Sequence, residues 1–181
     1  MHVGTKKMAA AGLLVAFVVV MLVFSSFIES NSLFFIAAAS FCVGIAIREW
    51  GQKYGLAFLV AATILSLILA PNKMYCLTFS GMGAYVWTTE LLWEQIARAK
   101  KMKHRNGMLW IGKYIVFNVM YIPVLIFAPM LIINKEVTWK MAIILFLVGQ
   151  ALLFVYDMAY RYFQTQIWGR LRLRFLGERN F

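Results

Sequence analysis

The sequence predicts an all-α integral membrane protein, a bundle of six transmembrane helices with both ends on the cytoplasmic side. Its 181 residues are 63% hydrophobic and 14% charged, with a mean hydropathy of +0.78, whereas a soluble domain is about half apolar and a quarter charged. The apolar residues form continuous runs, without the period-2 alternation of a membrane barrel. Basic residues gather between alternate runs, as they do on the cytoplasmic side of membrane proteins.

Six apolar segments divide the chain and leave no stretch long enough for a soluble domain. Residues 1–181 are therefore expected to form a single transmembrane domain. A spanning segment must satisfy its backbone hydrogen bonds internally, so each one is expected to be helical. Several uncharged cores are shorter than the ~20 residues that cross a bilayer, and flanking residues must complete them. The expected helices cover residues 8–28, 33–50, 54–70, 74–96, 108–134 and 138–168.

The first segment follows Lys6 and Lys7, so a cleaved signal peptide is an alternative to a retained helix. Apolar sequence resumes at Leu33, with no small-residue cleavage site and no polar mature domain after the run. A retained helix is therefore expected. The third and fourth segments are separated by the turn Pro71-Asn72-Lys73, after which the fourth carries small, hydroxylated and aromatic residues and ends in acids.

The distribution of charge orients the six helices. With the N-terminus inside and six crossings, the 18 basic residues divide 15 to 3, and merging or omitting one span would spoil this asymmetry. Only Lys73, Lys135 and Lys140 fall outside. The inner side receives Lys6, Lys7, Arg48, Lys53, Arg98, Lys100, Lys101, Lys103, Arg105, Lys113, Arg161, Arg170, Arg172, Arg174 and Arg179.

Polar side chains occur at one depth on three of the later helices. With a rise of ~1.5 Å per residue, Tyr85, Asn118, Tyr121 and Gln150 all fall near the middle of their spans. A polar group facing lipid there is costly, so these residues are expected to face the bundle interior. They either bond a neighbouring helix or line a solute cavity. Pro123 and Pro129, which we expect to interrupt the fifth span and free backbone carbonyls, favour the cavity.

The remaining carboxylates lie closer to the ends of the helices. Glu90 and Glu94 are one turn apart near the inner end of the fourth helix, within reach of Lys113. Asp157 and Arg161 have the i,i+4 spacing of an ion pair. Both sets are more typical of stabilised helix ends than of proton or cation transport. Glu29, in the outer loop between the first two helices, is the better candidate for contact with an incoming solute.

Motifs of enzyme chemistry are absent from the sequence, which contains no P-loop, G-x-S-x-G, H-E-x-x-H or paired C-x-x-C. We therefore expect no catalytic residue, cofactor or metal site, and we interpret Cys42 and Cys76 as buried thiols. The net charge of +11 is concentrated in 98–106 and 170–179. In a membrane protein these segments are typical anchors on anionic lipids, or a docking surface for a cytoplasmic partner, and nucleic acid is not expected. The basic end 160–181 is also amphipathic and suits the inner leaflet.

Small residues gather in the inner half of the first helix, where Met8, Gly12 and Ala16 follow a spacing of four within an alanine cluster. Such a face lets another helix approach closely. With the six spans, both ends inside, the length and the Pro71-Asn72-Lys73 turn, this sequence resembles the substrate-binding S component of energy-coupling factor (ECF) transporters. The resemblance covers nearly the whole chain, as architecture rather than as motif.

The resemblance implies a multi-pass protein of the bacterial plasma membrane that binds a small, vitamin-like organic solute. It also implies a transmembrane coupling subunit, driven by two cytoplasmic ATPases, that binds the first helix at Ala9, Gly12 and Ala16. The family's substrate lies near the outer face among the fourth, fifth and sixth helices. By position, that implicates Glu29, Asn31, Tyr75, Tyr85, Asn118, Tyr121 and Gln150. The fourth helix would then be one wall of the cavity, with Tyr85 and Thr78 facing the solute.

The sequence departs from the family in having Gly-x-x-x-Ala where Ala-x-x-x-Ala is common, and a short loop after the first helix. It also has no membrane-embedded histidine near the N-terminus, so a metal substrate is not expected. One rival function is a non-transporting scaffold, resembling the MreD family of cell-shape proteins. Another is a small membrane enzyme or lipid-handling protein that would use Glu90, Glu94 or Asp157.

Overall fold

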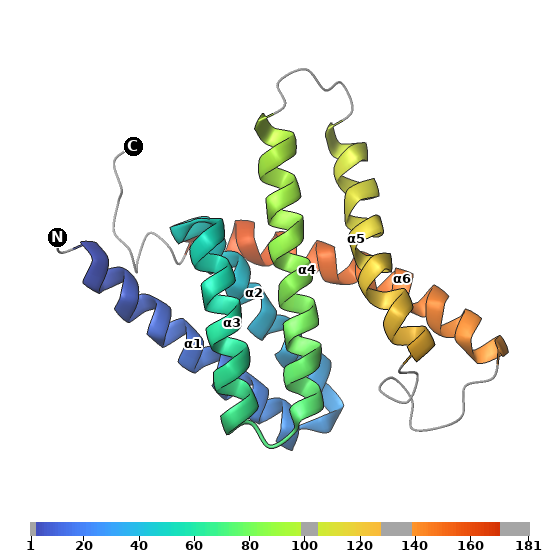
Figure 1. Ribbon diagram of the computed structural model, residues 1–181, viewed down its shortest axis with the longest axis horizontal. Coiled ribbons are helices and arrows are strands. Elements are labelled where there is room, and N and C mark those ends of the chain that lie inside the picture. Colours follow the sequence, from blue (N-terminus) through green and yellow to red (C-terminus); the bar gives the residue numbers. More distant parts are fainter. Residues whose placement is uncertain (1–2, 99–104, 128–138, 171–181) are drawn as a thin grey trace. The chain divides into compact units, whose positions relative to one another are not determined.

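The computed structural model describes residues 3–98, 105–127 and 139–170, and every regular element in these ranges is a helix (Figure 1). The prediction of an all-α protein is confirmed for the described residues. The expected helical residues 128–134 and most of the two basic segments, residues 99–104 and 171–179, lie outside them. The elements are α1 (Val3–Phe27), η1 (Glu29–Asn31), α2 (Ser32–Trp50), α3 (Gln52–Leu69), α4 (Lys73–Arg98), α5 (Arg105–Phe127), α6 (Trp139–Tyr162) and η3 (Phe163–Trp168).

Five described stretches of helix are long and apolar enough to cross a membrane. Their outward faces carry large apolar side chains, such as Leu13 at 70% and Ile68 at 69% exposed, which lipid solvates better than water does. The protein is therefore helical and embedded in a membrane. A sixth span through α4, with both ends inside, stays a prediction. The five stretches are Lys7–Phe27, Ser32–Trp50, Gln52–Leu69, Asn106–Leu125 and Lys140–Trp168.

The chain divides into two compact units, Met1–Val116 and Phe117–Phe181. In the first unit α2 is the central helix, which packs against α4, α1 and α3. Its residues 39–47 are all buried. A helix that is apolar on every side is stable when neighbours cover it on every side. Cys42 and Cys76 are free thiols in this core, 2% and 0% exposed, as predicted.

A single residue, Gly51, separates α2 from α3, where the sequence suggested a connection of three residues. Its φ of +95° and ψ of 168° lie in a region that is essentially restricted to glycine. Gly51 N donates to the Ile47 carbonyl oxygen at 2.7 Å. A Cβ on Gly55 would lie 2.2 Å from Ile47 Cγ1, so the two helices are in close contact from this turn onward.

The Pro71-Asn72-Lys73 turn ends α3 and begins α4 by side-chain hydrogen bonds. Lys73 Nζ donates to the carbonyl oxygens of Leu67 and Ala70, which the end of α3 leaves without helical partners. Asn72 Oδ1 accepts a hydrogen bond from Met74 N at 3.0 Å. The turn therefore satisfies backbone groups at the ends of both helices.

The second unit contains the end of α5, then α6 and η3. The expectation that Pro123 interrupts the fifth helix is wrong, because α5 continues through it to Phe127. Proline has no N–H to donate to the carbonyl of Val119, yet membrane helices tolerate this loss. Pro129 lies outside the described residues. Beyond Tyr162, α6 widens into the π-helical turn η3, a feature that recurs at functional sites.

Candidate functional site

The serine and threonine hydroxyl groups of α4 are used within the helix itself. Each donates to a carbonyl oxygen three or four residues earlier, so none requires a solute to satisfy it. These residues therefore do not by themselves indicate a cavity. The bonds, at 2.7 to 3.0 Å, run from Thr78 to Met74, from Ser80 to Leu77, from Thr88 to Ala84 and from Thr89 to Val86.

Tyr85 belongs to the core of the first unit, at 5% exposure. Thr78, which we expected to face the same ligand, is exposed, and Tyr75 is half-buried. Elsewhere on α4, a Cβ on Gly83 would lie 2.5 Å from Leu59 Cδ1, so the helix packs tightly within the unit at this point. Gly83 thus permits close packing of α4 on α3. Contact between Tyr85 and a solute stays a prediction.

In the second unit the structure brings together three of the predicted site residues. Gln150 Nε2 donates to Asn118 Oδ1 at 2.8 Å, which joins α6 to α5. One helical turn further along α5, the Tyr121 hydroxyl donates to the Leu145 carbonyl oxygen at 2.9 Å. These side chains therefore bond the neighbouring helix, which is one of the two predicted alternatives. A hydrogen-bonded amide pair can also form the wall of a cavity, so the solute cavity stays a prediction.

Tyr121 is further fixed by its neighbours in the second unit. Its ring stacks on Phe117, with centroids 5.0 Å apart and an interplanar angle of 20°. A Cβ on Gly149 would lie 2.6 Å from Tyr121 Cε1, so glycine allows the ring to lie directly against α6. The stack within α5 orients the tyrosine for its bond to Leu145, and that bond and the contact with Gly149 join α5 to α6.

The candidate solute-binding residues of the loop after α1 and the small-residue face of α1 lie on separate parts of the first unit. Glu29 and Asn31 occupy the 3-10 turn η1, and Asn31 is exposed at the start of α2. On α1, Ala9, Gly12 and Ala16 are all exposed. No described atom would lie within 4 Å of a Cβ on Gly12, so this face is open to a partner helix or to lipid.

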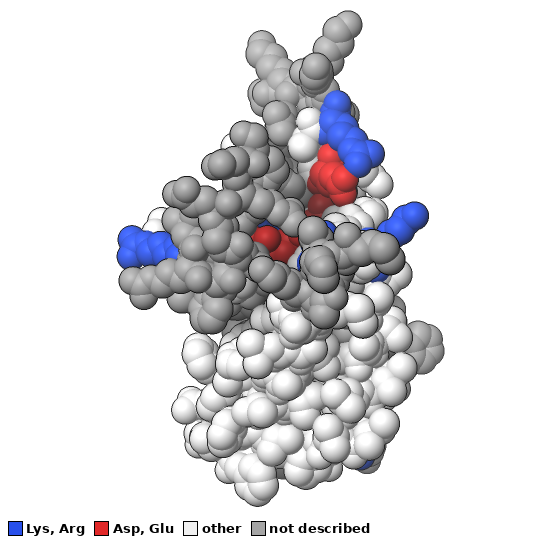
Figure 2. All heavy atoms as spheres, turned by 90° about the vertical axis from the view of Figure 1, so that its left-hand side faces the viewer, with Lys and Arg blue, Asp and Glu red and all other residues white. Residues whose placement is uncertain are grey.

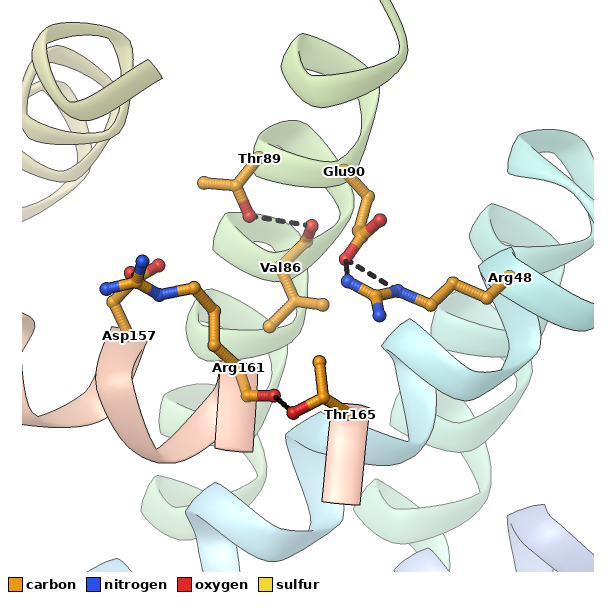
Figure 3. Close-up of polar contacts among 7 residues, drawn as sticks. All are labelled: Arg48, Val86, Thr89, Glu90, Asp157, Arg161 and Thr165. Atoms are coloured by element: carbon orange, nitrogen blue, oxygen red, sulfur yellow. Dashed lines mark hydrogen bonds and ion pairs between the residues drawn. The ribbon is translucent and has the colours of Figure 1, made fainter. Parts of the chain in front are cut away.

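At the C-terminal ends of α2 and α4, the structure contains an ion pair that sequence reasoning missed. Arg48 Nε and Nη2 donate to Glu90 Oε1 at 3.0 and 2.6 Å, and Figure 3 shows the two side chains pointing toward one another. The Glu90 side chain is 8% exposed and that of Arg48 37%. The sequence did contain a signal for this pair, because the charge distribution predicted that both residues lie at a similar depth, near the cytoplasmic side of the membrane. Lys113, which the sequence suggested as a partner for Glu90 and Glu94, has its Nζ atom 5.7 Å from the ring centroid of Trp110.

Two further ion pairs follow the helical i,i+4 spacing. Arg161 Nε lies 3.1 Å from Asp157 Oδ2, which confirms the pairing predicted from the sequence. Asp157 is almost fully buried, and Arg161 is half exposed. Arg98 pairs with Glu94 at the exposed C-terminal end of α4.

Comparisons with known proteins identify no relative: no family model, no curated protein and no solved structure matches the chain. Among the described residues, no group of three or more His, Cys, Asp or Glu side chains is placed to hold a metal ion. Assignment of a function therefore depends on the geometry of the helices and on the architectural resemblance.

Proposed function

We propose that this chain is the substrate-binding S component of an ECF-type importer in a bacterial plasma membrane. It would bind a small, vitamin-like organic solute and be coupled to two ATPases through a separate membrane subunit. The observation that carries the proposal is the face of α1 formed by Ala9, Gly12 and Ala16, which is small, exposed and open at Gly12. Small residues at a four-residue spacing favour close approach of a second helix in lipid.

The first prediction concerns this face. Tagged full-length protein, extracted from its native membranes in mild detergent, is expected to retain a coupling membrane subunit and two ATPases. Gly12→Leu or Ala16→Leu should reduce their recovery at least tenfold, because a leucine side chain separates the helix backbones. Mass spectrometry of the purified material measures the recovery.

Gly81→Leu is the matched control for this experiment. A Cβ at Gly81 also meets no described atom within 4 Å, but Gly81 lies on α4. Its variant should retain the subunits at the wild-type level. Recovery of cell-wall or cell-shape proteins instead, or of no partner, would contradict the importer proposal.

A non-transporting scaffold is the second candidate, and the hydrogen bond between Asn118 and Gln150 favours it, because each amide already has a partner within the protein. Solute dependence distinguishes the two functions. An importer component should gain about 2.7 kcal/mol of stability from one vitamin-like compound at 100 times its dissociation constant. A scaffold should gain nothing from any member of the screened set.

The second prediction is that leucine at both Asn118 and Gln150 abolishes this stabilisation by solute while the protein remains folded. Removing both partners of a hydrogen bond is nearly neutral, and such bonds in membranes contribute only ~0.6 kcal/mol on average. Each single leucine variant leaves one amide without its partner and should be less stable than the double variant. Thermal unfolding with and without the compound measures both effects. A double variant that still responds to the solute would exclude these amides from the site.

A further inference from the structure

A cleft with a volume of about 920 Å³ opens in the first unit where α2 ends, α3 begins and α4 approaches its C-terminal end. It is distinct from the predicted outer solute site. Figure 2 shows cations and acids side by side toward the upper end of the view, with a broad uncharged surface below them. The cleft lies at the C-terminal end of α4, which supplies Glu90, Glu94 and Arg98 to its lining.

The side chains of the cleft carry a net positive charge. Three cations line it, from Arg48, Lys53 and Arg98. Two carboxylates also line it, from Glu90 and Glu94, so the net charge of the lining is +1. The carboxylates hold two of the cations in place, since Glu90 accepts two hydrogen bonds from Arg48 and Glu94 pairs with Arg98. Lys53 is exposed on the first turn of α3. The cleft thus presents oriented cations to a ligand of negative charge.

The N-terminal end of α3 adds to this positive potential. Gly51, Gln52, Lys53 and Tyr54 all line the cleft. No side chain caps this end, and its first turn contains no acidic residue. The first N–H groups of a helix have no intrahelical acceptor, and its dipole favours an anion there. Both the backbone and the side chains therefore complement an anion in the same cleft.

The position of the cleft along the helices indicates where that anion comes from. The candidate spans Ser32–Trp50 and Gln52–Leu69 end and begin at the cleft, which places it at the level of a membrane surface. Tyr54 and Trp93 line it and are 67% and 50% exposed. Tyrosine and tryptophan are enriched at the boundary between membrane and water. The anions concentrated at that level are phospholipid phosphates.

We propose that this cleft is a binding site for the headgroup of an anionic phospholipid. Arg48, Lys53 and the N-terminus of α3 bind the phosphate, and Glu90 positions Arg48. Tyr54 and Trp93 contact the glycerol and the first acyl carbons. The site is independent of the proposed transport function, because neither the coupling subunit nor a solute takes part in it.

The test is thermal unfolding of the purified full-length protein in mixed micelles. Dioleoyl phosphatidylglycerol should raise the midpoint in a saturable way, and dioleoyl phosphatidylcholine should not. Lys53→Gln, at an exposed position, is expected to lower the apparent affinity for phosphatidylglycerol about fivefold. Lys53→Arg should keep it. Lys140→Gln removes one exposed charge from α6 and should also leave it unchanged.

Free glycerol 3-phosphate at the same concentration distinguishes a lipid site from a site for a soluble phosphate ester. The proposal expects it to have no effect, because the aromatic rim then has no glycerol ester or acyl chain to contact. Equal stabilisation by this compound would overturn the assignment to lipid. Equal responses of the Lys53→Gln and Lys140→Gln variants, or stabilisation by phosphatidylcholine, would remove the cleft as the site.

Discussion

Replacing Gly83 by leucine is expected to destabilise the first unit by about 3 kcal/mol, the upper end of the range for overpacking a filled core. A Cβ alone at this position would lie 2.5 Å from Leu59 Cδ1 and 3.3 Å from Val43 Cγ2. Those side chains belong to α3 and α2, so the added atoms would force α4 away from both helices at once. The close approach of α4 to α2 and α3 thus depends on the absence of a side chain at Gly83.

Gly81→Leu is the control, two residues earlier on the same helix. No described atom would lie within 4 Å of its Cβ, so only helix propensity changes, which favours leucine over glycine by up to ~1 kcal/mol. Equilibrium unfolding of the detergent-solubilised protein, followed by tryptophan fluorescence, compares the two variants. If both unfold at the wild-type midpoint, α4 does not pack on α2 and α3 through Gly83.

Replacing Arg48 by alanine is expected to lower the free energy of unfolding by about 2 kcal/mol. Removing one member of a buried ion pair costs roughly 3 to 5 kcal/mol, and a pair that is partly exposed to solvent costs less. Here Glu90 is 8% exposed and Arg48 37%, and the variant removes two hydrogen bonds from the carboxylate. The same unfolding measurement applies, in detergent without anionic lipid.

Arg98→Ala provides the comparison, because it breaks an arginine–glutamate pair at the same end of α4 whose side chains are 78% and 44% exposed. Exposed pairs contribute less than about 1 kcal/mol, so this variant should be close to wild type. A double variant, Arg48→Met with Glu90→Leu, should recover most of the lost stability, since neither charge is then buried alone. Equal losses in the Arg48 and Arg98 variants would show that the Glu90 ion pair has no special role.

The positions of the helices were predictable because runs of apolar residues, and the turn and charged residues between them, mark their limits. The second, third and fourth segments begin and end within three residues of the predicted limits. The Asp157–Arg161 pair was predictable for the same kind of reason, because its geometry is local to one helix. Polarity at the middle of a span correctly indicated that Asn118 and Gln150 face a neighbouring helix.

Contacts between helices could not be predicted with the same success. Arg48 and Glu90 are 42 residues apart, and their pairing depends on the packing of α2 against α4, which no periodicity in the sequence specifies. Pro123 was misjudged because a proline removes one hydrogen bond from a helix in any solvent, whereas a membrane helix can continue past that loss. The close contact at Gly83 likewise depends on which residues of α2 and α3 lie opposite it.

The polar character of α4 also bears on how this protein is synthesised. Among the described helices, α4 is the one that is not apolar enough to be recognised as a span, although it packs against α2 and α3, which are. A segment of this composition has little tendency to leave the translocation channel for lipid by itself. Because α2 and α3 emerge from the ribosome first, they can be present as an apolar hairpin when α4 arrives. We therefore expect the order of synthesis to help the fourth helix reach its place against α2 and α3.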